Sequence, residues 1–312
     1  MFDIAPDHLK QFQKNQPGMT GIFSFLNSKV LLFLFVVITF SSCTKEETVT
    51  DNVAPPDLTI EDVTISNYVN RVYISVLGRE PDSNEKNSGF SLLRSTNLSS
   101  VSRSSFLDAV FTRPDYKGHL YDLARIDLLN NLDTQEIHNQ LLTDSFALTI
   151  FTDTNIIIAL HDQINHLELL REVPHDLQNS SIDATVMFRR CVYNYFYDQI
   201  NMGTENFVKA VFLSFLLRSP TAYELSQSEQ MIDNGQAAIL FLQSGQSKND
   251  FLNIFFSSSD YAEGIVLNLY QRYLNRTPTS VEMSDETHVF QLAHNYQQVQ
   301  KDILSKNEYI FR

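Results

Sequence analysis

The chain of 312 residues has no tryptophan, and it contains few cysteines, glycines and prolines. Only two cysteines occur, Cys43 and Cys191, which excludes the multi-disulfide framework of small secreted domains. Nine glycines and nine prolines, with weak strand patterns throughout, indicate helices joined by short corners. Because 43% of the residues are apolar, we expect an all-α fold with a sizeable core.

Basic residues are scarce as well. The chain has 23 Lys and Arg against 37 Asp and Glu, a net charge of −14, which excludes nucleic acid as a partner because phosphate binding needs basic patches. It has no nucleophile-elbow, P-loop, dinucleotide-binding or EF-hand pattern. His161 and His166 are five residues apart, and His288 and His294 are six, whereas two ligands on one helical face need a spacing of four. We expect no metal site, no cofactor and no catalytic residue.

A short apolar run near the amino terminus predicts a secretory signal peptide. Lys29 precedes the 11 mainly apolar residues 30–40, and two serines follow. This is the order of regions in a cleaved signal, and the run is too short for an ordinary membrane span of ~20 residues. We therefore assign residues 1–42 to the signal. Met19 is an alternative start, because signals rarely carry a long polar preface.

The residues before Cys43 resemble the lipobox of bacterial lipoproteins. The resemblance implies cleavage before Cys43, its acylation with chains such as palmitate, and a stable anchor in the outer membrane. Phe40 stands where leucine is commoner, a departure familiar from Bacteroidota. The alternatives are a signal peptide with an incidental cysteine, or a short anchor. With Cys43 acylated, no intrachain disulfide is available, and Cys191 is expected to be a buried, inert thiol.

The residues after the lipidated cysteine bear on location. Lys45, Glu46 and Glu47 resemble the surface-export signal of Bacteroidota lipoproteins, which implies exposure at the cell surface. The alternative is an ordinary charged tether on the periplasmic leaflet. Residues 43–58 are polar and contain two adjacent prolines, so we expect a lipidated, flexible tether.

One motif occurs three times without a gap, at residues 72–85, 211–224 and 269–282. Each copy runs aliphatic–aromatic–x–x–apolar–Leu–x–Arg–x–Pro–(Asp/Thr)–x–x–Glu, and each unit closes on an acidic–Tyr pair 39 to 49 residues after the aromatic residue. An internal repeat is interpreted first, because it determines the architecture that the other features have to fit. The constant ends and variable middle predict one supersecondary unit with tolerant loops.

The chemistry of the motif predicts a helix, an Arg-x-Pro corner and a second helix. The apolar spacing forms one helical face, the proline ends that helix, and the Asp/Thr with the glutamate three residues later forms a capping box. The arginine either binds carbonyls or a carboxylate of its own repeat, or binds a ligand, and the closing tyrosine is expected in the core. The candidate residues are Arg79, Pro81, Asp82, Glu85 and Tyr116; Arg218, Pro220, Thr221, Glu224 and Tyr261; and Arg276, Pro278, Thr279, Glu282 and Tyr309.

Residues 76–82, with the closing 114–116, resemble the small helical domain of phycobilisome linkers and a related domain of unknown function in bacterial surface and secreted proteins. Residues 217–220 are also similar to helical modules beside planctomycete-type cytochromes, but no Cys-x-x-Cys-His haem site is present. Leu217 and Asn275 replace the glycine of the first copy, and the family's Gly–aromatic–Trp stretch is missing. The resemblance covers about half of the chain and implies an all-α scaffolding or binding module without catalytic residues.

The repeats define the expected domain organisation. Helical repeats cover residues 59–116, 206–261 and 262–312, and a helical insert covers residues 117–205. We expect function in this insert or in grooves between the motif copies.

Apolar spacing in the insert predicts three helices, over residues 120–129, 156–170 and 184–199. The middle helix is expected to bury one stripe of side chains, Ile157, Ile158, Leu160, Ile164 and Leu167.

These features predict a noncatalytic lipoprotein, anchored at the cell surface, that acts as a scaffold or binding module for a protein or glycan partner. The alternative is a polysaccharide-processing enzyme, or an accessory subunit of one. A deep pocket with converging carboxylates of perturbed pKa would favour the enzyme.

Overall fold

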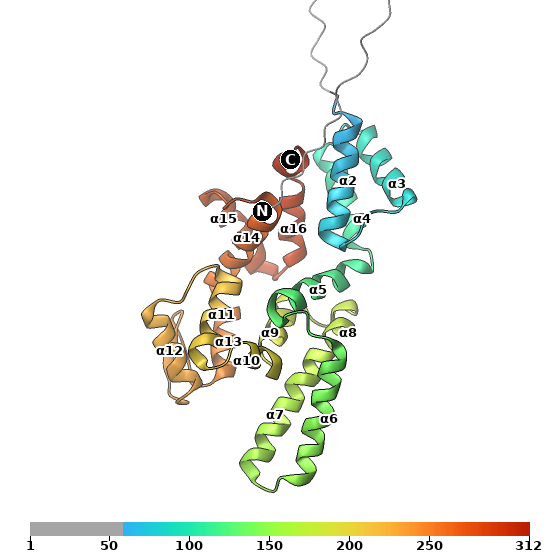
Figure 1. The fold of residues 1–312 in the computed structure, drawn as a ribbon. Coiled ribbons are helices and arrows are strands. Elements are labelled where there is room, and N and C mark those ends of the chain that lie inside the picture. The colour runs from blue at the N-terminus through green and yellow to red at the C-terminus, as the bar shows by residue number, and fades with distance from the viewer. Residues whose placement is uncertain (1–58) are drawn as a thin grey trace, which may run out of the picture. The chain divides into compact units, whose positions relative to one another are not determined.

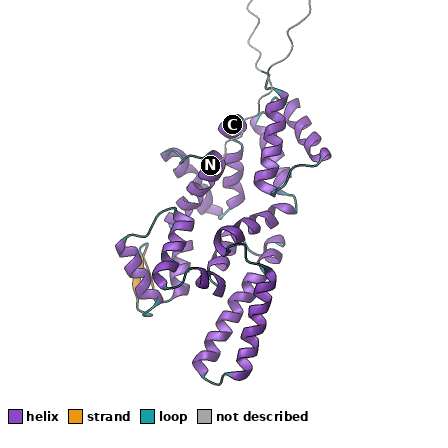
Figure 2. Cartoon of the chain, viewed as in Figure 1, coloured by secondary structure: helices purple, strands orange, loops and turns teal. Residues whose placement is uncertain are grey.

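The computed structural model describes residues 59–312, and the predictions for the signal, the tether, Cys43, Lys45, Glu46 and Glu47 lie outside this range. The described residues form sixteen helices and one two-stranded hairpin, packed as a helical bundle around one continuous hydrophobic core (Figure 1, Figure 2). The expected helical class is confirmed. This part of the chain is one compact unit with its own hydrophobic core, as an independent domain has. Within it, none of the helices has the length and apolar character of a membrane span.

In chain order, the elements run from a long first helix to a single-turn helix at the carboxyl end. They are α2 (Asp62–Leu77), α3 (Ser83–Ser95), α4 (Ser100–Phe111), α5 (Asp115–Leu129), α6 (Thr134–Ile150), α7 (Thr154–Arg171), α8 (Val173–Gln178), α9 (Ala184–Val192), α10 (Tyr195–Ile200), α11 (Thr204–Leu216), α12 (Ala222–Ile232), β1 (Ala238–Leu240), β2 (Gln243–Gly245), α13 (Lys248–Phe256), α14 (Ser259–Leu274), α15 (Ser280–Ala293), α16 (Tyr296–Leu304) and α17 (Asn307–Ile310).

The first motif copy forms the corner that its residues predict. Helix α2 buries Val72 and Tyr73 on its apolar face and ends at Gly78, whose left-handed φ of 71° lets its N–H bond back to the last turn. Helix α3 begins with the predicted capping box, in which Asp82 and Glu85 each accept from the other's backbone N–H.

The second and third copies form the same corner. Thr221 with Glu224 caps α12, and Thr279 with Glu282 caps α15. In each copy a third helix follows (α4, α13 or α16), and the acidic–Tyr pair opens the next helix (α5, α14 or α17). Helix α14 therefore closes the second unit and is also the first helix of the third, and the expected boundary after residue 261 falls inside it.

The described segment's first helix packs against its last residues. The Tyr68 hydroxyl of α2 donates to the Leu304 carbonyl over 3.1 Å, and Arg71 donates to the Ile310 carbonyl over 3.0 Å. One turn further along α2, Ser75 Oγ lies 2.9 Å from the Tyr309 hydroxyl. Residues more than 230 positions apart are thus joined by hydrogen bonds.

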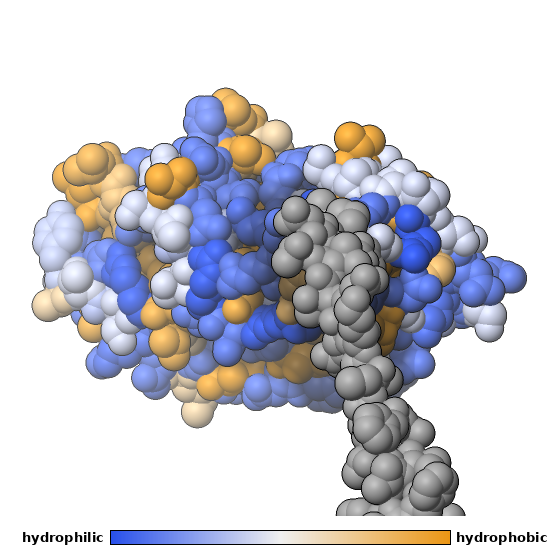
Figure 3. Space-filling model, turned by 90° about the horizontal axis from the view of Figure 1, so that it is seen from above, coloured by the Kyte–Doolittle hydropathy of each residue, from blue (hydrophilic) through white to orange (hydrophobic). Residues whose placement is uncertain are grey.

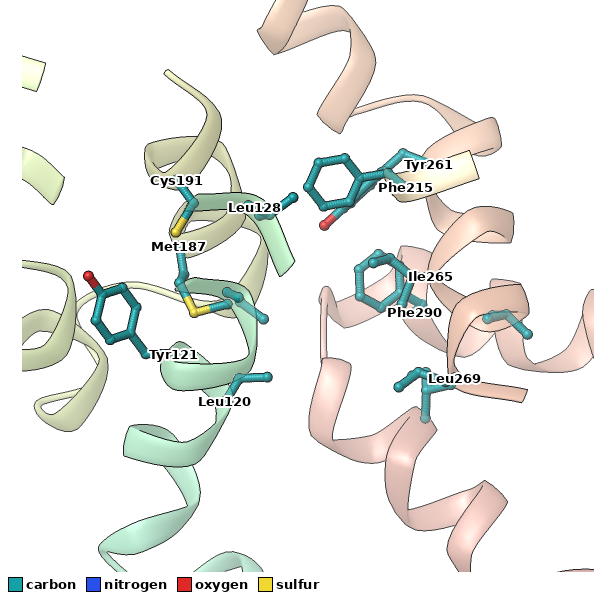
Figure 4. Close-up of a cluster of buried hydrophobic side chains, with 14 of the residues drawn as sticks. Leu120, Tyr121, Leu128, Met187, Cys191, Phe215, Tyr261, Ile265, Leu269 and Phe290 are labelled. Carbon is teal, nitrogen blue, oxygen red and sulfur yellow. The ribbon is translucent and has the colours of Figure 1, made fainter. Parts of the chain in front are cut away.

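The insert differs from its prediction at residues 184–199. Two helices, α9 and α10, replace the single predicted helix. Asn194 is the cause, because its buried amide donates to the carbonyls of Arg190 and Cys191 and its oxygen accepts from the Tyr197 N–H, which ends one helix and caps the next. Cys191 is fully buried, as expected, and burial raises the pKa of its thiol to about 12 (Figure 4).

The predicted buried stripe of the middle insert helix is wrong for most of its length. Leu167 is buried, but Ile158 is 62% exposed, and Ile157, Leu160 and Ile164 are only half-buried. Helix α7 packs on α6 along its length and meets α8, α9 and α10 only near its base. The two helices project as an antiparallel pair (Figure 1), so a second buried face has nothing to pack against.

A short antiparallel hairpin, β1 with β2, has no counterpart in the sequence prediction. Its two-residue turn, Phe241-Leu242, has φ of 46° and 63°, as a type I′ turn requires. Neither residue carries the usual Asn-Gly signal for such a turn, and three-residue strands are too short to show alternation.

Candidate functional site

Each motif arginine binds two carboxylates from its own unit. Arg79 donates to both oxygens of Glu85, over 2.7 and 2.9 Å, and its Nε donates to Asp115 over 2.7 Å. Glu85 also accepts from the Asp82 N–H over 2.9 Å. One guanidinium therefore ties the corner to the acidic residue that opens α5, an arrangement that we call an ionic triad.

The same ionic triad occurs in the other two copies, with donor–acceptor distances of 2.7 to 2.9 Å. The motif arginines thus have hydrogen-bonding partners inside the fold, and the acidic residue before each closing tyrosine has a structural role that the sequence does not reveal. The members are Arg218, Glu224 and Asp260 in the second copy and Arg276, Glu282 and Glu308 in the third.

The triads keep their glutamates ionised. Hydrogen bonds from Arg79 lower the pKa of Glu85 to about 2, although burial opposes the shift. Burial also acts to raise the pKa of Glu224, but hydrogen bonds from Arg218 and Thr221 together outweigh it, so this pKa is lowered too. The carboxylates therefore stay charged at neutral pH and hold their arginines.

The aromatic residue of each copy packs under its arginine. The guanidinium carbon lies 5.8, 5.2 and 5.2 Å from the ring centroid in copies one, two and three. A cation over an aromatic face is stabilised by the ring quadrupole, so the six-residue spacing from the aromatic residue to the arginine has its own structural reason. The pairs are Tyr73 with Arg79, Phe212 with Arg218 and Tyr270 with Arg276.

The closing tyrosines lie in the core and connect elements. The Tyr116 hydroxyl donates to Gln300 over 2.6 Å, and the amide nitrogen of Gln300 donates to Tyr273 over 2.7 Å, which joins the first copy to the third. Tyr261 bonds to Thr185 of the insert over 3.3 Å. Tyr309 lies 2.9 Å from the Ser75 hydroxyl of α2, so each of the three buried tyrosines has a hydrogen-bonding partner on another element.

A polar cleft of about 430 Å³ lies between α7, α10 and α13. Its carboxylates are paired, because Asp198 forms an ion pair with Lys248 and Asp162 lies 3.5 Å from His166. Burial lowers the pKa of His166, and its ring centroid lies 3.9 Å from that of Tyr193, with the two ring planes tilted by 37°. Among residues 59–312, no group of three or more His, Cys, Asp and Glu side chains is arranged to hold a metal ion.

The most exposed apolar cluster of the insert lies on the projecting α6–α7 pair. Phe146 is 66% exposed and Ile158 is 62% exposed. The face of the described unit in Figure 3 is by contrast mainly hydrophilic, with apolar side chains scattered across it. Three of the exposed side chains, Leu142, Phe146 and Ile150, are spaced by four residues and so share one face of α6, and exposed apolar side chains gathered on one face mark an interaction surface. We call it the hairpin patch; it comprises Leu142, Phe146, Ile150, Phe151, Ile156 and Ile158.

The helical pair that carries the hairpin patch is acidic. Between Thr134 and Arg171 the chain contains five carboxylates and one basic residue, Arg171, which pairs with Glu168. One of the five carboxylates, Asp144, is buried and accepts from Gln140 and Gln163, each over 2.8 Å, which joins α6 to α7. The others are Glu136, Asp153, Asp162 and Glu168.

The sequence carries a signal for the hairpin patch. Three consecutive β-branched apolar residues, Ile156 to Ile158, cannot all face one helical stripe, because neighbours in a helix are turned by about 100°. Such a run on a helix indicates that one of the apolar side chains faces solvent or a partner.

Comparisons with protein-family models, with curated proteins and with solved structures found no match to this chain.

Proposed function

We propose that this protein is a noncatalytic scaffold built from three copies of the helical unit, and that it is tethered to the outer membrane through an acylated Cys43. It would dock a protein partner through the hairpin patch. The observation that carries the proposal is the patch itself, six large apolar side chains exposed on a projecting pair of helices. The motif arginines, by contrast, have carboxylate partners inside the fold.

The charge of the helical pair indicates what the partner looks like. Of the five carboxylates on the pair, Asp144 is buried and Glu168 pairs with Arg171, and the remaining three favour an apolar recess rimmed by Lys and Arg. A second copy of the chain would bring these same carboxylates against one another, which is repulsive. An anionic lipid surface fits no better, because amphipathic helices bind it through rows of lysine and arginine, which this helical pair lacks.

The polysaccharide-processing alternative would place chemistry in the polar cleft. Asp162 and Asp198, the two carboxylates there, are each paired with a cationic or titratable side chain. Because Lys248 pairs with Asp198, the cleft does not offer the two free carboxylates that glycoside hydrolysis commonly uses, and this favours a binding role.

A matched pair of double variants tests the docking proposal. Leu142→Ser/Phe146→Ser removes apolar area from one face of α6 in the hairpin patch, and Val101→Ser/Val281→Ser, at 74% and 69% exposure, removes it elsewhere. The tethered full chain is affinity-purified from its own membranes, and co-purified proteins are quantified by mass spectrometry. We expect at least one protein to be lost, about tenfold or more, only with the first variant, because truncating central apolar anchors costs about 1 kcal/mol or more each.

Added salt should weaken the same complex if a basic rim faces the carboxylates. Equal recovery from both double variants would contradict the proposal. So would dimerisation of residues 59–312 through the hairpin patch, or their sedimentation with phosphatidylcholine vesicles, since these would assign the patch to a second copy or to lipid.

The lipid anchor has its own test. We expect Cys43→Ala to abolish incorporation of radiolabelled palmitate, because this substitution removes the thiol that the acyl chains need. Cys191→Ala is the matched control, and it should keep the label because Cys191 is fully buried. Labelling of the Cys43→Ala protein, measured after gel separation, would refute the acylation site.

A further inference from the structure

A cavity of about 240 Å³ lies where α5, α11 and α14 meet. Its walls come from the insert on one side and from the second and third motif copies on the other. Figure 4 shows the two groups facing one another, with Leu120 and Leu128 of α5 opposite Phe215, Ile265 and Leu269. Its lining combines these apolar side chains with a few polar ones, Asp127, Asn268 and Arg272 among them, which is the usual composition of a small-molecule pocket.

The mouth of the cavity is polar and balanced in charge. Arg272 of α14 donates to Asp127 of α5 over 2.9 Å, which bridges 145 positions of sequence. Asn268, one turn before Arg272, donates to the carbonyls of Phe215 and Gly264 over 2.9 and 2.8 Å. A ligand head at this mouth therefore meets one cation and one anion that already neutralise each other.

The backbone conformation of Leu217 is a second observation that points to a ligand site at this cavity. It lines the wall, and its backbone is left-handed, with φ of 53°. The same motif position holds Gly78 in copy one and Asn275 in copy three, residue types that tolerate this conformation, whereas a leucine there is strained. Strained residues concentrate at ligand sites, where the side chain is needed in spite of its backbone.

We propose that this cavity is a binding site for a small amphipathic molecule with an apolar body and an uncharged head that both donates and accepts hydrogen bonds. The body, such as an eight-carbon chain, fills the apolar space, with Leu217 as part of its wall. The head, such as a hydroxyl, accepts from Arg272 and donates to Asp127 without displacing either. The site is separate from the hairpin patch, so its test is independent of the docking proposal.

Calorimetric titration of the isolated segment 59–312 with octan-1-ol and with octanoate tests the assignment. We expect saturable binding of one octan-1-ol, and at least fivefold weaker binding of octanoate, whose charge competes with Asp127. Leu217→Gly should weaken octan-1-ol binding at least fivefold without lowering the melting temperature, because it removes wall area and relieves strain at once. Asn275→Gly changes the same backbone position away from the cavity and should leave binding unchanged.

Ala124→Leu provides a second variant, since Ala124 is buried in the wall and three added carbons occupy the cavity. It should abolish binding while the helical circular dichroism persists. Absence of saturable octan-1-ol binding to the unmodified segment would overturn the proposal, as would equal effects of Leu217→Gly and Asn275→Gly. Tighter binding of octanoate than of octan-1-ol would contradict the assignment of an uncharged head group to the ligand.

Discussion

Arg218→Gln should lower the free energy of unfolding by about 2 kcal/mol at pH 7, measured by urea denaturation of residues 59–312, because hydrogen bonds to a partly buried carboxylate are lost while solvent screens the rest. The substitution leaves Glu224, whose side chain is 13% exposed, without the cation that neutralises it, and it removes the arginine that pairs with Asp260. The effect of removing the motif arginine should be clearest in the second copy. In the other two copies a further cation, Arg113 or Lys306, lies within 4 Å of the triad glutamate.

The direction of the pKa shift of Glu224 determines how this loss of stability depends on pH. Because the folded-state pKa of Glu224 lies below its ordinary value of 4.5, its stabilisation is complete above that value and is lost as pH falls. The difference between the parent and Arg218→Gln should therefore shrink below pH 4.5. Lys209→Gln is the control, because it breaks an exposed pair with Glu205 and should cost under about 0.5 kcal/mol. An equal cost for both variants would show that the triad is only a surface pair.

Gly264→Ala is the second change with a large expected effect, a loss of about 3 kcal/mol. A methyl group on Gly264 of α14 would overlap the Phe215 carbonyl oxygen and lie 3.0 Å from Leu216 Cδ2. Since both are on α11, two packed helices would have to separate, and backbone atoms cannot rotate away as a side chain can.

Gly118→Ala is the matched control. Gly118 is also inside a helix, but nothing lies within 4 Å of the added methyl group. Alanine has the higher helix propensity, so this variant should gain about 0.5 to 1 kcal/mol. Opposite signs for the two glycines, measured in one denaturation series, would establish the close approach of α11 and α14, and similar losses would argue against it.

The corners of the fold could be predicted because their causes are local. The proline at position 81 and the capping box of Asp82 with Glu85 act within a few residues, so the sequence contains the whole explanation. The carboxylates Asp115, Asp260 and Glu308 could not be paired in advance with the arginines, because 32 to 42 residues separate them and the length of the middle varies.

Other features escaped prediction because they depend on what packs nearby. Asn194 breaks a helix only because its amide is buried against its own backbone. Ile158 looks like a core residue by periodicity, but α6 is the main neighbour along α7 and leaves one face uncovered. Leu217 gives no sign of its left-handed backbone in isolation; only alignment with Gly78 and Asn275 points to it.

The hydrogen bonds between α2 and residues 304–310 set an order of events during synthesis. Helix α2 is made early, yet Tyr68, Arg71 and Ser75 have to wait for partners more than 230 residues later. Contacts of such long range form slowly and late. The emerging chain therefore lacks its finished packing while most of it is already made.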